Sequence, residues 1–230
     1  MDIINFLFHL LKDPLATLQD FLTHYQTLTY LVVALIIFVE TGLIVMPILP
    51  GDSLLFAIGL LASSTGQLDL QILIPLLIGA ALLGDNVNYY VGKNFSRFIR
   101  KRERILFFKH EYLIETEQFY EKHGGKAVIA ARFVPIIRTV APFVAGAGSM
   151  KYSKYILFCI LGASLWVTSL TLAGYFLGSN EWVKLNFEKI VLGIVFVSFM
   201  PMILHVIQKK VQKNLLYFLI QKLMRFLNDK

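Results

Sequence analysis

The stretch from Ala131 to Gly146 constrains this chain most, because it is apolar enough for a membrane yet contains two arginines and two prolines. Arg132 and Arg138 are six residues apart, and Pro135 and Pro142 interrupt the run. Proline removes a backbone donor and clashes with the preceding turn, so we do not expect one continuous helix. An arginine at the bilayer centre costs about 2.5–3.5 kcal/mol on insertion scales, so both need a partner. A lipid phosphate is a suitable anion.

The composition indicates a helical membrane protein with several spans. The chain has 230 residues, 57% of them hydrophobic, and a formal net charge of +7. Its basic residues flank hydrophobic runs, which is the positive-inside pattern of membrane proteins rather than a nucleic-acid-binding pattern. The single cysteine, Cys159, excludes an intrachain disulfide and a cysteine-based metal cluster. The histidines show no metal spacing, so we expect no metal site, no cofactor and no nucleic-acid partner.

The first third of the chain contains two interrupted runs. Residues 1–27 predict an N-terminal amphipathic segment in two pieces, divided at Asp13-Pro14. Residues 28–62 are apolar but are broken by Pro47, Pro50 and Gly51. Two interpretations fit this broken run, a full span followed by a short helix or a re-entrant hairpin near 40–60. Broken backbone at membrane depth requires protein or a polar cavity around it.

The rest of the chain alternates between apolar runs and basic segments. We expect a loop at 63–71, a span at 72–91, cytoplasmic surface helices at 93–126, a second broken run at 127–148, spans at 155–177 and at about 190–207, and a basic amphipathic helix at 208–230. Most of the 22 basic residues lie in the two basic segments, which places both segments and the C-terminus in the cytoplasm. The run 127–148 then enters from the cytoplasm and returns to it.

These expectations define a fold class. We predict an all-α polytopic membrane protein whose single membrane domain, 28–207, has about three to four spanning helices, interfacial amphipathic helices and two opposed re-entrant hairpins. A faint echo between 77–82 and 160–165 supports an inverted repeat. Inverted repeats are typical of transporters, with the site at the broken helices near mid-membrane.

The candidate site consists of charged residues within the broken runs. Arg132 and Arg138 are candidate phosphate ligands, because guanidinium presents a planar fork to phosphate oxygens. Glu40 and Asp52 are candidate proton carriers, because low dielectric favours the neutral form of a carboxylate unless a cation compensates. The alternative is that these four residues form static ion pairs. Asp85 either contacts a cavity or caps a surface turn.

Several of these residues match a known family pattern. They are Glu40-Thr41-Gly42, Pro50-Gly51-Asp52, Gly84-Asp85 and the run from Arg132-Phe133-Val134-Pro135 to Arg138-Thr139. With them the chain resembles the DedA family of bacterial inner-membrane proteins, which is related to the VTT-domain lipid scramblases. Lys93-Asn94 stands where the family pattern suggests a further glycine after Gly92. Thr139, within the arginine motif, is a further possible cavity residue.

The resemblance implies a function and a location. Family members look like flippases that return undecaprenyl phosphate to the cytoplasmic leaflet, driven by the proton motive force. We therefore expect a multi-pass protein of the bacterial inner (plasma) membrane with a membrane lipid and protons as partners. Whether the protein forms a homo-oligomer is left open.

Other functions are also open. A broad-specificity phospholipid scramblase would move ordinary phospholipids without coupling. A lipid phosphatase would need a nucleophile and an acid–base partner, for which His123 is the nearest histidine to the arginines in the sequence. A non-transporting membrane organiser would move no lipid. We expect a transporter and not an enzyme.

Overall fold

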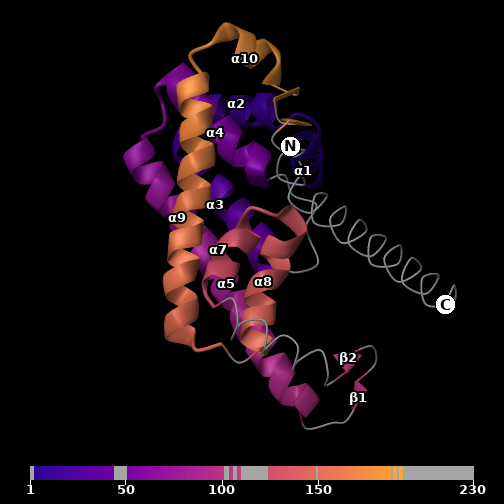
Figure 1. Ribbon diagram of the computed structural model, residues 1–230. Helices are drawn as coiled ribbons and strands as arrows, with labels where there is room; N and C mark the ends of the chain where they lie inside the picture. Colours follow the sequence, from indigo (N-terminus) through magenta and orange to yellow (C-terminus); the bar gives the residue numbers. More distant parts are fainter. Residues whose placement is uncertain are drawn as a thin grey trace, which may run out of the picture.

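A computed structural model describes residues 3–43, 51–100, 104–105, 108–109, 124–148, 150–187, 189–190 and 192–193. In these residues the fold is helical apart from two strands of two residues each (Figure 1). The helices are α1 (Ile3–Lys12), α2 (Pro14–His24), α3 (Gln26–Gly42), α4 (Gly51–Thr65), α5 (Leu70–Arg100), α7 (Lys126–Arg132), α8 (Pro135–Ala147), α9 (Tyr152–Leu177) and α10 (Glu181–Leu185). The strands β1 (Arg104–Ile105) and β2 (Phe108–Lys109) form an antiparallel hairpin.

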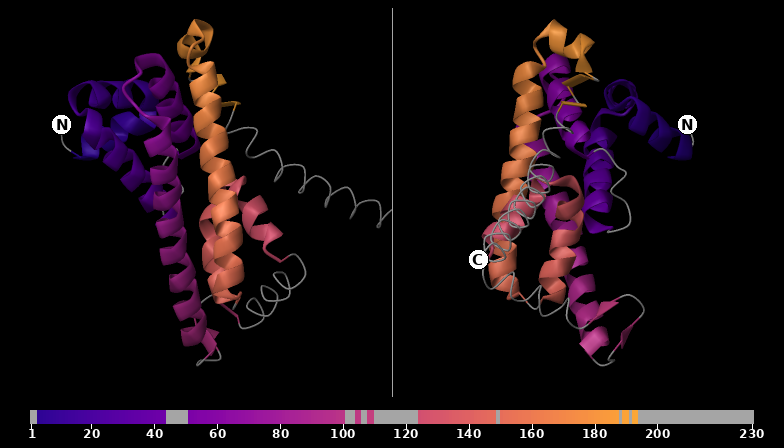
Figure 2. Two further views of the ribbon diagram at one scale, coloured as in Figure 1. Left: turned by 90° about the vertical axis from the view of Figure 1, so that its left-hand side faces the viewer. Right: turned by 45° about the vertical axis from the view of Figure 1, so that its right-hand side comes forward.

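Two helices, α5 and α9, run along the whole length of the bundle (Figures 1 and 2). They contain apolar segments at Leu70–Ser96 and Tyr152–Leu177, of 27 and 26 residues. At about 1.5 Å per residue each segment is about 40 Å long, which exceeds the hydrocarbon core of a bilayer. Both helices are therefore long and apolar enough to cross a membrane, as the sequence predicts for 72–91 and 155–177.

The outward faces of these two helices are apolar. Only 33% of the most apolar window of each helix is buried, whereas the core helix of a soluble protein is mostly buried. Large hydrophobic side chains are exposed along both helices, namely Ile72, Leu76, Leu83 and Val87 on α5 and Leu157, Ile160, Leu161 and Leu165 on α9. Monomeric soluble proteins rarely expose so continuous an apolar surface, so these faces suit contact with lipid.

The helices α3, α4 and α8 are apolar but shorter, with 17, 15 and 13 residues. α4 and α8 are too short to cross a bilayer, which needs about 20 residues. The sequence predicts a broken run here, and α3 does end at Gly42 while α4 begins at Gly51. Figures 1 and 2 place α4 toward the end of the bundle that holds α10 and α8 toward the opposite end.

The N-terminal segment is divided at the predicted position. The side chain of Asp13 accepts a hydrogen bond from the Ala16 backbone N–H at 3.0 Å, and Pro14 is the first residue of α2. An aspartate cap followed by proline is a favourable helix start, because proline has no N–H to leave unpaired. Figure 1 shows α2 running across the long axis of the bundle.

The structure differs from the sequence predictions in three places. Lys93–Arg100 continues α5 instead of starting a surface helix, and residues 104–109 contain the β1–β2 hairpin. Pro142 lies inside α8 and does not divide it, although Pro135 does begin that helix. Two of the expected three to four spans are found in the described residues, and the span expected at about 190–207 lies almost wholly outside them.

The physical reasons for these differences are local. α5 continues beyond its apolar stretch, because adding polar residues to an existing helix is easier than starting a new one. The proline of α8 costs one backbone hydrogen bond, which a neighbouring helix can compensate in a membrane protein. Nearly all of the expected span at 190–207, the tail at 208–230, most of 110–126, and Pro47 and Pro50 lie outside the described residues.

α4 and α9 cross at a pair of glycines. A methyl group on Gly59 would overlap the backbone carbonyl of Thr171, and one on Gly174 would overlap the carbonyl of Phe56. On each helix the glycine comes three residues after the residue whose carbonyl it exposes to the other helix: Gly59 follows Phe56 on α4, and Gly174 follows Thr171 on α9. Small residues at such a crossing let two backbones approach closely, which drives helix association in lipid.

α5 and α8 cross in the same way. A methyl group on Gly92 would overlap the carbonyl of Phe143, and one on Gly146 would overlap the carbonyl of Tyr89. The spacing of three residues is repeated on both helices. The two most extensive helix contacts in the described bundle are therefore built on one pattern, with α4 corresponding to α8 and α9 to α5.

Candidate functional site

The charged residues singled out from the sequence lie inside the bundle, where the ends of the short helices meet. Glu40 is in the last turn of α3, Asp52 in the first turn of α4, and Arg138 in the first turn of α8. Arg132 is the last residue of α7, and Asp85 lies within the long helix α5. All five side chains are buried, with residue exposures between 1% and 9%. The interrupted helices thus bring charges together in the interior of an apolar protein.

Arg138 lies between two carboxylates, and we call these three residues the Arg138 centre. Its Nη2 donates to Glu40 Oε1 at 2.5 Å, and its Nη1 donates to Asp52 Oδ1. The fork of the guanidinium therefore bridges the end of α3 and the start of α4. With both carboxylates ionised, the Arg138 centre has a formal charge of −1. A buried centre with this excess charge favours either a proton or a further cation.

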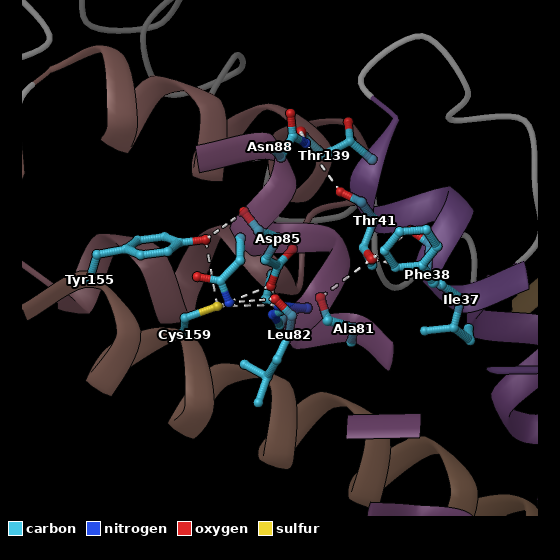
Figure 3. Close-up of polar contacts among 12 residues, drawn as sticks. Ile37, Phe38, Thr41, Ala81, Leu82, Asp85, Asn88, Thr139, Tyr155 and Cys159 are labelled. Carbon is cyan, nitrogen blue, oxygen red and sulfur yellow. Dashed lines mark hydrogen bonds and ion pairs between the residues drawn. The ribbon is translucent and has the colours of Figure 1, made fainter. Parts of the chain in front are cut away.

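Arg132 forms a second centre with Asp85, and we call this pair the Arg132 centre. Arg132 Nη2 pairs with Asp85 Oδ2, which also accepts a hydrogen bond from Cys159 Sγ at 3.0 Å. The hydroxyl of Tyr155 donates to the backbone carbonyl of Asp85 at 3.0 Å. Figure 3 shows Tyr155 and Cys159 of α9 pointing toward Asp85. This centre is charge-balanced, and one cation faces one carboxylate.

Trp166 of α9 connects the two centres. Its Nε1 donates to Asp52 Oδ1 at 2.8 Å. Arg138 Cζ lies 4.8 Å from the indole centroid and Arg132 Cζ lies 5.7 Å from it. Both distances are within cation–π range, and such contacts contribute more when the cation is desolvated. One indole therefore contacts both arginines and one of their carboxylates.

Asn88 holds the surrounding backbone together. Its Nδ2 donates to the carbonyl of Thr41 at 3.1 Å and to the carbonyl of Thr139 at 2.8 Å (Figure 3). These bonds join the end of α3, the middle of α5 and the first half of α8. Thr41 Oγ1 donates back to the carbonyl of Ile37 at 2.9 Å, which satisfies that hydroxyl within α3. The charged residues are thus mounted on backbones that are tied to one another.

The energetic balance of such centres is asymmetric. Desolvating two ions costs several kcal/mol each, and their attraction only roughly repays it. Removing one partner, however, costs about 3–5 kcal/mol because it leaves an uncompensated buried charge. The ion pairs are therefore weak evidence for stability as such. Charged residues in an apolar interior mark a candidate site for a charged ligand or a proton.

The structure separates the sequence-predicted residues into two groups. Glu40 and Asp52 both contact Arg138, whereas Arg132 pairs with Asp85, a residue for which the sequence left a cavity contact and a surface cap equally open. Asp85 is 1% exposed, so it does not cap a surface turn. Thr139 lies beside Asn88 through its backbone carbonyl.

The predicted hairpin breaks are placed as follows. Gly51 begins α4 and Pro135 begins α8, whereas Pro142 is internal to α8.

Sequence reasoning missed Trp166 and Cys159 as members of the site. They are seven residues apart on α9, with Gly162 between them, so they lie on one face of that helix. Two side chains that can donate a hydrogen bond on one face of an apolar helix only weakly indicate a site, because tryptophan and cysteine are also common in packed cores. Asn88, three residues after Asp85, was a stronger signal, since a buried amide requires partners.

Comparison with known proteins identifies the family. Residues 49–176 match the VTT domain. Protein DedA of Escherichia coli strain K12 is 44% identical over 211 residues, which cover 91% of this chain and 96% of that protein. An uncharacterised membrane protein of Mycobacterium leprae is 48% identical over 166 residues, covering 72% of this chain and 74% of that protein. Inner membrane protein YqjA of E. coli strain K12 is 33% identical over 159 residues, covering 69% and 71%.

No solved structure matches the chain. The domain match covers more than half of the sequence, and the similarity to Protein DedA extends over nearly all of both proteins. Together with the apolar helices α5 and α9, these matches show that the chain belongs to the DedA family of VTT-domain membrane proteins.

Proposed function

We propose that this protein is a flippase that moves a phosphate lipid, undecaprenyl phosphate or a similar molecule, from the outer to the inner leaflet of the bacterial plasma membrane. The observation that carries the proposal is the Arg138 centre. In this centre a buried arginine is held by two carboxylates where interrupted apolar helices meet. Its guanidinium can exchange a carboxylate for an incoming anion.

Phosphate chemistry suits the two arginines. Arg132 and Arg138 both lie against the Trp166 ring, so one phosphate group beside that ring would be within reach of two guanidinium forks. Charge-assisted bonds from arginine to phosphate are strong and directional. In the proposed cycle the phosphate replaces one of the two carboxylates as a partner of Arg138, while the hydrocarbon tail stays in the bilayer.

Protons provide the driving force in this proposal. When Glu40 or Asp52 takes up a proton, its attraction for Arg138 falls and one side of the guanidinium becomes free for phosphate, while the other carboxylate remains paired. When the carboxylate loses the proton, it recovers Arg138 and the phosphate leaves. A proton entering on one side and leaving on the other would thus couple lipid movement to the proton motive force. Glu40→Gln is expected to uncouple transport from a pH gradient.

We further propose that α3–α5 and α7–α9 form an inverted repeat. The glycine crossings of α4 with α9 and of α5 with α8 have the same spacing, as a two-fold relation between α3–α5 and α7–α9 requires. In such an arrangement the α3–α4 and α7–α8 breaks are opposed re-entrant hairpins around one site. We propose that one hairpin opens to each side of the membrane. The positive-inside rule then places residues 93–126 and the C-terminus in the cytoplasm.

Transport in reconstituted liposomes tests the proposal. The purified protein is inserted into vesicles that carry a fluorescent prenyl phosphate, and movement between leaflets is measured with a membrane-impermeant quencher under an imposed pH gradient. Arg138→Ala and Arg132→Ala are expected to abolish transport. Lys126→Ala, which removes an exposed cation from α7, is the matched control and is expected to retain it.

Each outcome of this assay separates the proposal from an alternative. Undiminished transport by both arginine variants would refute the proposed site. Equal, uncoupled movement of phosphatidylcholine would instead indicate a broad-specificity scramblase. Release of inorganic phosphate from the lipid would indicate a lipid phosphatase.

A further inference from the structure

The carboxylate of Glu40 lies at the N-terminal end of α4. Its Oε1 accepts from Arg138, but Oε2 is buried and has no side-chain hydrogen-bond partner among the described residues. A methyl group on Gly51 would overlap both oxygens and the carboxyl carbon. The Glu40 side chain is 1% exposed. A fully buried carboxylate oxygen is therefore aimed at the first residue of α4, whose backbone is its nearest polar neighbour.

The N-terminus of α4 is suited to an anion. The first N–H groups of a helix have no partner within the helix, and the helix dipole places partial positive charge at this end. α4 has 15 residues, and its first residue is glycine, which leaves room for the Glu40 carboxylate beside the N-terminal backbone. The Asp52 carboxylate is already bonded to Arg138 and Trp166. The helix end and Arg138 thus converge on a single carboxylate, that of Glu40.

We propose that the N-terminus of α4, left open by Gly51, forms a binding site for a phosphate monoester together with Arg138. Glu40 occupies this site as an internal anion in the present structure. The inference rests on the proposed function and extends it, because it adds backbone groups of α4 to the arginine as phosphate ligands. A phosphate can accept from Arg138 and from helix N–H groups at once, since it has more acceptor oxygens than a carboxylate. The same chemistry fits a lipid phosphate and free phosphate.

Two substitutions act on this site in opposite directions. Gly51→Ala places a methyl group where the anion lies, so it should weaken phosphate binding. Glu40→Gln removes the competing internal anion but keeps the shape of the side chain, so it should strengthen phosphate binding. Gly79→Ala is the matched control, because a methyl group on Gly79 of α5 meets nothing within 4 Å.

Fluorescence of Trp166 provides the measurement. The chain has two tryptophans, and Trp166 is the one beside Arg138. In a Trp182→Phe background the full-length protein in detergent is titrated with inorganic phosphate, with a long-chain prenyl phosphate in mixed micelles, and with phosphatidylcholine. We expect Gly51→Ala to weaken prenyl phosphate binding by about tenfold or more, which corresponds to about 1.4 kcal/mol. Glu40→Gln should bind more tightly than the parent protein, and Gly79→Ala equally.

The outcomes are distinguishable. Binding that requires Arg138 but is the same in Gly51→Ala and Gly79→Ala would overturn this inference and leave the proposed function intact. No binding of either phosphate probe to the parent protein or to Glu40→Gln would overturn both. If Gly51→Ala fails to fold, Glu40→Gln decides, and unchanged or weaker binding overturns the inference. Binding of prenyl phosphate alone identifies the lipid as the ligand source, and equal binding of inorganic phosphate identifies the phosphate group itself; both support the site.

Discussion

The Arg138 centre and the Arg132 centre contain the same kind of ion pair but differ in charge balance and in backbone support. Arg138 faces two carboxylates, each on the end of a short helix. Arg132 faces one carboxylate, in the middle of the long helix α5, and that carboxylate is also bonded to Cys159 of α9. The first centre has an excess charge and stands on interrupted helices. The second is balanced; its arginine ends the short helix α7, but its carboxylate stands on a continuous helix.

This difference suggests separate roles. A centre with surplus negative charge can take up a proton without leaving its arginine unpaired, because one carboxylate remains. A balanced pair cannot lose its carboxylate without leaving a buried guanidinium uncompensated. We therefore assign exchange of partners to the Arg138 centre and a fixed position to the Arg132 centre, and four predictions test that assignment.

The largest effect is expected from removing the arginines. Arg138→Ala leaves two buried carboxylates without a cation and Arg132→Ala leaves one, so both should destabilise the fold by about 3–5 kcal/mol, with Arg138→Ala the more severe. Thermal unfolding of the purified variants in one detergent measures this, with Lys126→Ala as the reference. A smaller loss for Arg138→Ala than for Arg132→Ala would contradict the comparison.

Neutralising a carboxylate should separate the centres most clearly. Asp85→Asn leaves Arg132 without a carboxylate among the described residues, so a loss of about 3 kcal/mol or more is expected. Glu40→Gln leaves Arg138 paired with Asp52, so a loss of no more than about 1 kcal/mol is expected. The same unfolding measurement compares them. Equal losses would show that the two centres do not differ in the way that their charges suggest.

Trp166 should have an intermediate effect, because it touches both centres. Trp166→Phe keeps an aromatic ring for the arginines but removes the hydrogen bond to Asp52, which is expected to cost about 1.5–3 kcal/mol. Trp166→Leu also removes both cation–π contacts and should cost more. Unfolding temperatures and transport rates of both variants are to be compared. If the leucine variant is as stable and active as the phenylalanine variant, the ring contacts are unimportant.

The smallest effect is expected at Cys159. Serine can donate to Asp85 Oδ2 as the thiol does, so Cys159→Ser should change stability by less than about 1 kcal/mol. Cys159→Ala removes the donor but leaves the ion pair with Arg132, and it should be only slightly less stable than the serine variant. A loss from Cys159→Ser as large as that from Asp85→Asn would mean that the thiol, not the charge pair, holds this centre.

Much of the fold could be predicted because its signals are local. Long apolar runs predict α5 and α9, and proline marks the starts of α2 and α8. The extension of α5 to Arg100 and the uninterrupted α8 could not be predicted, since they depend on packing that compensates polar sequence and Pro142. The glycine crossings could not be predicted either, because the sequence does not show which helix a glycine packs against.

The site was predicted in its members but not in its pairing. Arg132, Arg138, Glu40 and Asp52 are conspicuous as charges in apolar runs. Which carboxylate meets which arginine depends on helices that are far apart in the sequence, so Asp85 could not be assigned to Arg132. Trp166 and Cys159 gave almost no signal, because an apolar or weakly polar residue in an apolar helix is expected in any case.

The claim that Arg138 receives the phosphate of a lipid is tested most directly by native mass spectrometry of the intact protein. The purified protein is released from detergent after incubation with equal amounts of undecaprenyl phosphate, phosphatidylethanolamine and phosphatidylglycerol. We predict that the wild-type protein retains undecaprenyl phosphate preferentially, that Lys126→Ala does so equally, and that Arg138→Ala loses the preference. Equal retention of undecaprenyl phosphate by the wild-type protein and a folded Arg138→Ala variant would contradict the account.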